Sequence, residues 1–234
     1  MKSLKLGKGE LMENFTVLNM LSLEHTAARE LFKKVKYPFE VLPLISDFIK
    51  ELIKSLDLNV YEKRAEDVYV AKSARIAPTA YIAGPCIIGE NTEVRHCAFI
   101  RGSALIGDNC VVGNSTELKN VILFDNVQVP HYNYVGDSVL GYRSHMGAGS
   151  ITSNVKSDKT LVNVRCGQEV LKTGLKKFGA ILGDCVEVGC GSVLNPGTMI
   201  GRNTNIYPLS SVRGTVAKNS IYKSAGETVE KRQQ

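Results

Sequence analysis

The chain has 234 residues, of which 44% are apolar and 22% are charged, proportions that are ordinary for a water-soluble globular protein. No apolar run is long enough to span a bilayer, and the first residues lack the apolar core and cleavage site of a secretory signal, so we expect a cytoplasmic protein with no membrane partner. The formal net charge is +6, but no dense Lys/Arg block is interleaved with aromatic residues, so nucleic acid is not an expected partner.

The positive charge fits either small anionic ligands or a generic solvated surface. The six cysteines include no CxxC pair and no histidine at a zinc-ligand spacing, so no metal site is expected. Cys86 and Cys110 instead occupy positions where the chain repeats small side chains, which favours a packing role for reduced thiols.

Residues 1–66 are expected to form a helical hairpin. Apolar residues recur at helical spacing between Thr16 and Lys36, and again from Val41 to about Leu58, with Pro38 interrupting the pattern. Both apolar stripes are too wide to remain in water, so the hairpin must cover another apolar surface.

From Val70 onward an aliphatic residue recurs every six positions. The first members of this series are Val70, Ile76, Ile82, Ile88, Val94, Ile100, Ile106, Val112 and Leu118. A small or β-branched residue comes four positions after each, and Gly or Ala often follows directly, where we expect the backbone to turn. A period of six is typical of a hexapeptide solenoid, in which short strands join at tight corners and the coils stack as parallel sheets. The sequence therefore predicts an all-β fold, a parallel β-helix over residues 67–217, and we expect the helical hairpin to cover its open first coil or a neighbouring subunit.

The repeat is interrupted in its middle. The steps from Leu118 to Leu123 and from Val135 to Leu140 are five residues long, and residues 154–179 have no repeat at all. Such an insertion is expected to be a lid or an arm that reaches a neighbouring subunit, although simple loop variation would also explain it. The rhythm resumes at Leu182, and a polar tail, residues 218–234, follows the domain.

Three cations break the pattern just after an aliphatic residue, where Gly or Ala is usual: Arg95, Arg101 and Lys119. Their spacing in whole hexapeptides suggests that they lie along one side of the coil stack, where they would suit a phosphate. The alternative is that an exposed corner tolerates large residues. His131 lies in an aromatic run between the two five-residue steps, and it is either a general base or an ordinary surface histidine.

Three segments carry a resemblance to a known enzyme family: GNSTELKN (113–120), VPHYNYVGDSVLG (129–141) and GAGSITSN (147–154). They resemble the acetyltransferase domain of the bifunctional glucosamine-1-phosphate N-acetyltransferase/N-acetylglucosamine-1-phosphate uridylyltransferase. LKKFGAILGD (175–184) is similar to a segment of the archaeal sugar-1-phosphate nucleotidylyltransferase/amino-sugar acetyltransferases. The resemblance covers roughly residues 68–215, and we expect this chain to lack the nucleotidylyltransferase domain of those relatives.

The resemblance implies a left-handed parallel β-helix that forms a homotrimer, with acetyl-CoA as co-substrate lying along the coils between subunits. It assigns His131 as the catalytic base and Glu117 as the carboxylate that orients it. The resemblance assigns Arg101 and Lys119 to the phosphate of the sugar or to the phosphates of a nucleotide. The sugar itself would contact Tyr134, Asn154 and His145, where His145 replaces a substrate asparagine of the uridylyltransferase-fused enzymes. The cofactor positions are Ala148, whose N–H could stabilise an oxyanion, and Cys190, which replaces a CoA-contacting serine.

The leading hypothesis is an acetyl-CoA-dependent N-acetyltransferase that acts on an amino-sugar 1-phosphate such as glucosamine-1-phosphate, in the synthesis of UDP-N-acetylglucosamine or another nucleotide sugar. Two alternatives stay open. The acceptor could be another sugar or a nucleotide sugar, acetylated on nitrogen or oxygen. The chain could also be a non-catalytic trimeric partner of a separate sugar-1-phosphate nucleotidylyltransferase, with the apolar helical hairpin as its docking element.

Overall fold

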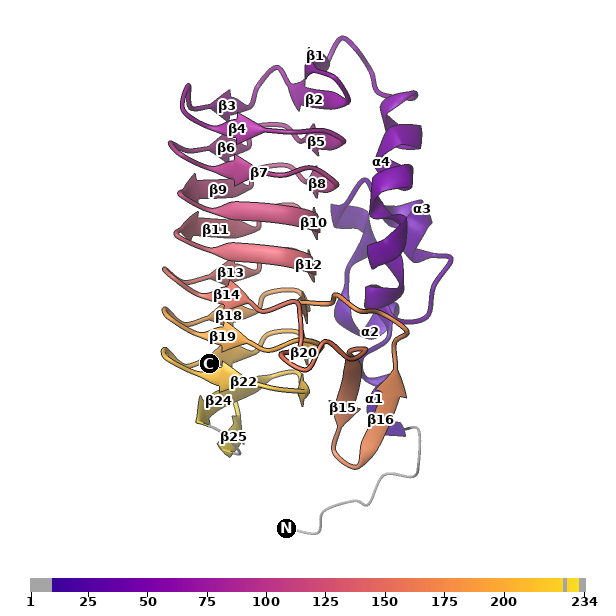
Figure 1. Cartoon of the computed structure of the whole chain (residues 1–234), viewed down its shortest axis with the longest axis vertical. Coiled ribbons are helices and arrows are strands. Elements are labelled where there is room, and N and C mark those ends of the chain that lie inside the picture. The colour runs from indigo at the N-terminus through magenta and orange to yellow at the C-terminus, as the bar shows by residue number, and fades with distance from the viewer. Residues whose placement is uncertain (1–9, 225–226, 232–234) are drawn as a thin grey trace.

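A computed structural model describes residues 10–224 and 227–231, and it is a stack of short parallel strands wound around one axis (Figure 1). One coil comprises three hexapeptides, since Val68 pairs with Cys86 and Cys86 pairs with Ala104. Each full coil contributes three strands, so the period of six corresponds to one side of a three-sided coil. The prediction of a parallel β-helix is confirmed.

The strands form three columns, which we call the front, rear and flank faces. The front face comprises β4 (Tyr81–Ile82), β7 (Phe99–Ile100), the first parts of β10 (Glu117–Leu123) and β12 (Tyr134–Leu140), β14 (Ile151–Thr152), β19 (Val193–Leu194) and β22 (Ser211–Val212). The rear face comprises β3 (Arg75–Ile76), β6 (Glu93–Val94), β9 (Val111–Asn114), β11 (Gln128–His131), β13 (His145–Met146), β18 (Glu187–Val188), β21 (Asn205–Ile206) and β24 (Ser220–Ser224). The flank face comprises β2 (Val68–Ala71), β5 (Cys86–Ile88), β8 (Ala104–Ile106), the last parts of β10 and β12, β17 (Ala180–Leu182), β20 (Thr198–Ile200) and β23 (Thr215–Val216).

The repeated aliphatic residues fill the inside of the stack. Ile88, Val94 and Ile100 are each at most 1% exposed. The interior threonines at the small-residue position donate their hydroxyls to the next coil: Thr92 bonds to the Gly107 carbonyl at 2.8 Å and Thr116 to the Val129 carbonyl at 2.9 Å. Polar side chains are therefore tolerated inside because the neighbouring backbone accepts their hydrogen bonds.

The glycines after the aliphatic residues have a different role from the expected one. The left-handed corner conformation is adopted two residues later, for example by Asn91 and Asn109, with φ of 56° and 55°. A Cβ atom on Gly113 would instead lie 1.6 Å from the Pro130 carbonyl oxygen. The small residue is needed there because the next coil approaches closely, and the turn itself is made by Asn and other residues at positive φ.

The two five-residue steps lie at one corner. β10 and β12 run continuously from the front face onto the flank face, and they bend at Asn120 and Asp137, with φ of 55° and 47°. Each of these coils loses one residue at that bend, so that Ala104 pairs with Val121 and not with Ile122.

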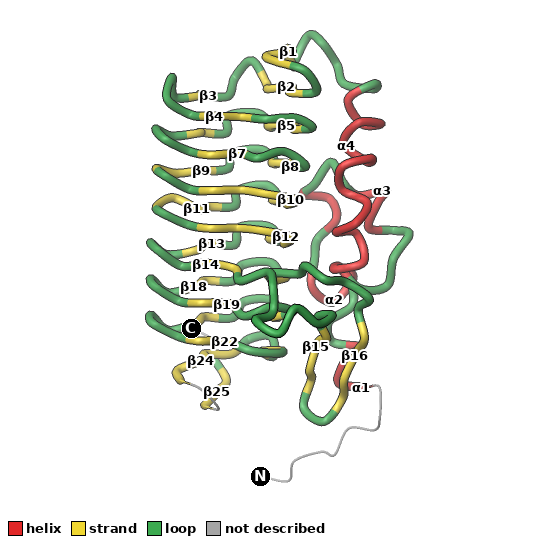
Figure 2. Tube along the Cα trace, in the orientation of Figure 1, coloured by secondary structure: helices red, strands yellow, loops and turns green. Residues whose placement is uncertain are grey.

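Most of the helical elements lie along the flank face, not over the first coil as expected, and the first of them lies beside the insertion, where the Met12 N–H donates to Glu169 (Figure 2). The helical elements are α1 (Glu10–Glu13), α2 (Val17–Met20), η1 (Leu23–His25), α3 (Arg29–Phe32), η2 (Pro38–Leu44) and α4 (Ile45–Ile53). Ile45 and Ile49 of α4 are fully buried, and the ring of Phe32 meets that of Phe124 edge-on at 5.4 Å. The apolar stripes predicted that this segment is covered, but they could not identify the covering surface. None of the helices in the described part of the chain could cross a membrane.

Both ends of the stack are extended by antiparallel strands. β1 (Tyr61–Ala65) pairs with β2, and β25 (Glu227–Glu230) pairs with β24. Part of the predicted tail, Ser220–Ser224, therefore belongs to the rear face. Residues 225–226 and 232–234 of the tail and residues 1–9 of the predicted hairpin lie outside the described residues.

The insertion forms a hairpin of β15 (Asn163–Cys166) and β16 (Glu169–Lys172) beside the last flank strands (Figure 1). Val162 and Val164 are fully buried, and the ring of Phe178 lies 5.4 Å from that of Phe39. The insertion packs on its own chain, and Leu161 and Val170 remain about half exposed. An arm that reaches a neighbouring subunit stays a prediction.

Candidate functional site

Two of the three pattern-breaking cations lie on the front face. Arg101 follows β7 and donates its backbone N–H to Leu118, and Lys119 follows Leu118 one coil further along. Arg95 lies on the rear face instead, where it pairs with Glu93 at 3.2 Å. The expectation that all three share one side was wrong for Arg95, because each hexapeptide advances the chain by one face and only a full coil returns it to the same face.

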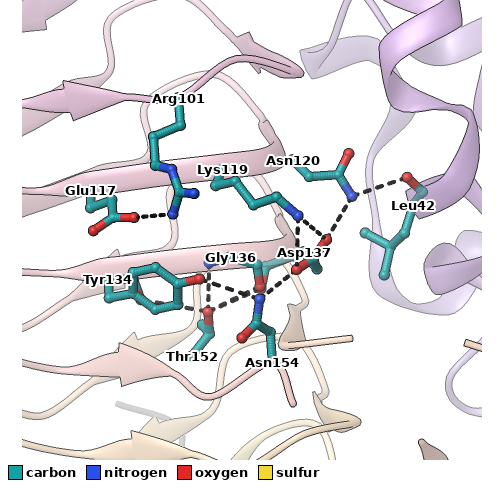
Figure 3. A network of polar contacts seen from close by, with 11 residues as sticks. Leu42, Arg101, Glu117, Lys119, Asn120, Tyr134, Gly136, Asp137, Thr152 and Asn154 are labelled. Carbon is teal, nitrogen blue, oxygen red and sulfur yellow. Dashed lines mark hydrogen bonds and ion pairs between the residues drawn. The ribbon is translucent and has the colours of Figure 1, made fainter. Parts of the chain in front are cut away.

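Lys119 is held by a buried carboxylate. Its Nζ lies 3.1 Å from Oδ1 of Asp137, a residue that is 4% exposed (Figure 3). The amide of Asn154 also donates to Asp137 and lies 3.3 Å from the hydroxyl of Tyr134. Three predicted substrate residues, Lys119, Tyr134 and Asn154, are thus joined in one network around Asp137, which the sequence analysis did not single out.

Arg101 and Glu117 form a second pair beside this network. Nη1 of Arg101 donates to Oε1 of Glu117 at 2.7 Å, and this hydrogen bond raises the pKa of Arg101 (Figure 3). Burial, and then the negative charges of Asp137 and Glu117, raise the pKa of Tyr134, so its hydroxyl stays protonated and can donate at neutral pH.

His131 lies at the end of β11 on the rear face, and its side chain is exposed. Its backbone N–H donates to the side chain of Asn133 at 3.1 Å, and the Asn133 amide donates to the carbonyls of Gly147 and Ser150. Asn133 therefore fixes the corner that presents His131. The sequence did contain a signal for it, since an asparagine stands where neighbouring coils have the small residues Thr116 and Ser150.

Glu117 lies at the same corner one coil before His131, at the start of the front-face strand β10. Its backbone N–H donates to the Asn133 carbonyl at 2.8 Å, while its carboxylate bonds to Arg101. The structure thus places both predicted catalytic residues at one corner but gives the carboxylate a cation as its partner. An orienting contact from Glu117 to His131 stays a prediction.

The two predicted cofactor residues continue the His131 corner along the stack. The Gly149 N–H donates to the His131 carbonyl at 3.0 Å, and the Gly191 N–H donates to the Ala148 carbonyl at 2.9 Å. Ala148 and Cys190 are both exposed. Within residues 10–224 and 227–231, the Ala148 N–H donates no hydrogen bond.

His145 is separate from the front-face network. It begins β13 on the rear face, and its Nδ1 lies 2.8 Å from Oε2 of Glu187. A contact from His145 to the same sugar as Tyr134 and Asn154 would need the site to include another subunit, and its predicted role stays untested.

A hollow of about 450 Å³ on the rear face is lined by Arg75, Glu93, Arg95 and His96. Arg95 is the one of the three pattern-breaking cations that lines it, and the front-face network around Asp137 lies outside it.

Comparisons with known proteins identify the family. The model of the GMPPB C-terminal domain matches residues 82–199, half of the chain. The bifunctional protein GlmU of Methanococcus aeolicus is 34% identical over 217 residues, which cover 76% of this chain and 53% of that protein. The resemblance to the bifunctional enzymes is therefore confirmed, and the chain spans about half the length of this relative.

Two further matches cover more of the matched protein. The uncharacterized acetyltransferase YaiX of Escherichia coli is 32% identical over 185 residues, which cover 71% of this chain and 78% of YaiX. The Arabidopsis UDP-N-acetylglucosamine acyltransferase structure is 14% identical, with a TM-score of 0.44, over 71% of this chain and 65% of that one. Because the family model matches half of the chain, the chain belongs to the GMPPB C-terminal domain family.

Proposed function

We propose that this protein is an acetyl-CoA-dependent N-acetyltransferase whose acceptor is an amino-sugar 1-phosphate. The observation that carries the proposal is the corner at Asn133. On one side of it stands the exposed His131, followed along the stack by Ala148 and Cys190, and on the other side stand Arg101, Lys119 and Tyr134. A base with a cofactor track thus adjoins cations suited to a phosphate. The acetyltransferase name of the relative YaiX supports acetyl transfer as the activity.

The proposed reaction is a direct transfer. The sugar amine attacks the thioester carbonyl of acetyl-CoA, His131 accepts the proton that the amine loses, and the CoA thiolate leaves and is protonated. The Ala148 N–H would donate to the oxyanion that forms at the carbonyl. Arg101 and Lys119 would hold the phosphate, so that much of the rate comes from keeping the amine and the thioester together.

We further propose that the active unit is a homotrimer with each site between two chains. Side chains at the corner of His131 support this assembly: Tyr132 is 65% exposed and Leu209 is 84% exposed. Both adopt positive φ, 51° and 59°, which is unfavourable for such residues unless the position is otherwise required. Large apolar side chains held in this way on an open corner fit an interface with a second copy of the chain.

The apolar stripe that suggested a docking role for the helical segment is covered by its own chain. The apolar stripe of α4 is buried against the flank strands of its own chain, with Ile45 and Ile49 fully covered. It is therefore not available as a docking surface for a separate nucleotidylyltransferase. Another acceptor sugar, or transfer to oxygen, remains an outcome of the test below.

The test measures release of the CoA thiol from acetyl-CoA with glucosamine-1-phosphate, galactosamine-1-phosphate and a nucleotide-linked amino sugar as acceptors. Replacing His131 with Ala should lower turnover by about 10²–10⁴-fold, the usual contribution of a general base. His96→Ala is a matched control, because His96 is an exposed histidine at the same corner two coils earlier, bonded to Thr79 at 2.9 Å. Equal turnover by both variants would remove His131 from the mechanism. Thiol release that depends on an amine-free sugar phosphate, added as a further acceptor, would make a hydroxyl group the acceptor in place of the amine.

A further inference from the structure

Asp137 is the point where three parts of the chain meet. Its carboxylate accepts hydrogen bonds from Lys119 and Asn120 of the preceding coil, at 3.1 and 3.0 Å, and from Asn154 at the start of the insertion. Its backbone carbonyl accepts the N–H of Gly179, at the end of the insertion, at 2.8 Å. The Asn120 amide also donates to the Leu42 carbonyl at 3.1 Å and so connects the carboxylate to the helical segment (Figure 3).

The turn at this position does not require a carboxylate. Ser103 and Asn120 occupy the equivalent corner of the two preceding coils with φ of 51° and 55°, close to the 47° of Asp137. Serine and asparagine therefore make the same bend. A carboxylate that is 4% exposed is costly to bury unless it is paired, so its presence at this one coil calls for a role beyond the bend.

The partners of the carboxylate indicate that role. Lys119 is a flexible side chain with a mobile ammonium group, and Asn154 can present either its amide N–H or its carbonyl oxygen. The hydrogen bond to Asp137 fixes the position of the Lys119 ammonium and leaves its other N–H groups free to donate to a ligand. The Asn154 side chain is held with its amide nitrogen toward Asp137, so its carbonyl oxygen points away from Asp137. Figure 3 shows both side chains converging on Asp137 from neighbouring coils, with Tyr134 beside Asn154.

We propose that Asp137 is a positioning residue of the acceptor site, which fixes the Lys119 ammonium for the phosphate and the Asn154 amide for the sugar. This inference rests on the proposed function, since it names the residue that arranges the acceptor half of that site. It acts through Lys119 and Asn154 and does not touch the cofactor track along His131, Ala148 and Cys190.

The test is a kinetic comparison of Asp137→Asn with a matched control, Asp184→Asn. Asp184 is also buried, at 5% exposure, pairs with Arg202 at 3.3 Å and accepts the Tyr142 N–H at 2.9 Å, but it contacts none of the candidate site residues. For Asp137→Asn we expect the KM for the amino-sugar phosphate to rise about tenfold, the effect of one charged contact held out of place, while the KM for acetyl-CoA changes less than twofold. Asp184→Asn should lower the melting temperature and leave both KM values unchanged.

A double-variant cycle separates positioning from a general loss of structure. Because Asp137 acts in part through Lys119, its removal should raise the acceptor KM of a Lys119→Met enzyme by a smaller factor than it raises that of the unaltered enzyme. The double variant also leaves no buried charge unpaired, so it serves if Asp137→Asn alone does not fold. Full additivity of the two changes, or equal increases in both KM values, would overturn the inference while leaving the transferase activity intact. Failure of the unaltered protein to acetylate any amino-sugar phosphate would instead overturn the proposed function, and this inference with it.

Discussion

Two buried thiols make the stability of the protein dependent on alkaline pH. Cys86 and Cys110 are 0% and 1% exposed, and burial raises the pKa of each from its ordinary value of 9.0 to about 12. Between these values the unfolded chain loses the thiol proton while the folded chain keeps it. The free energy of unfolding should therefore fall, above pH 9, by about 1.4 kcal/mol per pH unit for each thiol.

Urea unfolding at pH values from 8.5 to 10.5 measures this effect. The Cys86→Ala/Cys110→Ala variant should start less stable but lose less stability with rising pH than the unaltered chain. Cys97→Ala, which removes an exposed thiol, should keep the original pH dependence. Parallel pH curves for all three proteins would show that the buried thiols do not stay protonated.

At the residue scale, the sequence predicted which side chains matter better than it predicted their partners. Arg101 and Lys119 were found because they break the repeat, and they do share the front face. Arg95 was grouped with them because a period of six does not distinguish the three faces. The partners of these cations, Glu117 and Asp137, depend on the exact path of the corners, which a repeat pattern does not contain.

The helical segment and the coils should differ in how firmly they are held. Phe32 of α3 is fully buried and meets Phe124, and truncating such a ring costs about 3–5 kcal/mol. The coils keep their own hydrogen bonds without this contact. We therefore expect Phe32→Ala to release residues 10–53 to proteolysis while the strand signal in circular dichroism persists.

Leu18→Ala provides the control for this experiment. Leu18 belongs to the same helical segment but is 79% exposed, so its truncation should leave the proteolysis pattern unchanged. If Phe32→Ala instead loses the helices and the strands in one transition, the segment and the coils form a single cooperative unit.

At the element scale, the sequence did indicate which face of the stack the helices cover, but the six-residue repeat alone does not distinguish that face from the other two. The residue before the interior aliphatic points outward, and on the flank face it is apolar and buried in coil after coil: Ile87, Leu105, Ile122, Val139, Ile181 and Met199. At every third hexapeptide two consecutive apolar residues are buried, one facing inward and one outward, which indicates a strand that is covered on both sides. The helices could thus have been assigned to this face, whereas their breaks into short pieces depend on local packing and are not visible in the pattern.

For the whole molecule, the stack predicts a rule for deletions. Removing residues 180–197 takes out one full coil, and Ile200, Ile206 and Val212 then occupy the interior positions of Leu182, Val188 and Leu194. We expect this shortened chain to fold, with lower stability because one interface between coils is lost. Removing only residues 180–194 takes out less than a full coil. It would place Gly197 at an interior aliphatic position and should prevent folding of the following coils.

Circular dichroism and urea unfolding of the two deletion variants test this rule. The full-coil deletion is expected to unfold in a cooperative transition. The partial deletion is expected to unfold with a smaller change in the circular dichroism signal, because its C-terminal coils do not fold. Equal stability of the two variants would mean that the interior register does not determine the fold of this part of the chain.

The alignment of the coils also fixes the distances between site residues along the axis of the stack. Neighbouring parallel strands are separated by about 4.8 Å, so residues in one column are spaced in units of that length along the axis. Arg101 and Lys119 are one unit apart, and His131, Ala148 and Cys190 mark successive units at the adjoining corner. A ligand that contacts both the cations and the corner residues therefore extends along the axis by a whole number of coils. A relative with one coil more or one coil fewer between its cations and its corner residues would select a ligand longer or shorter by about 4.8 Å.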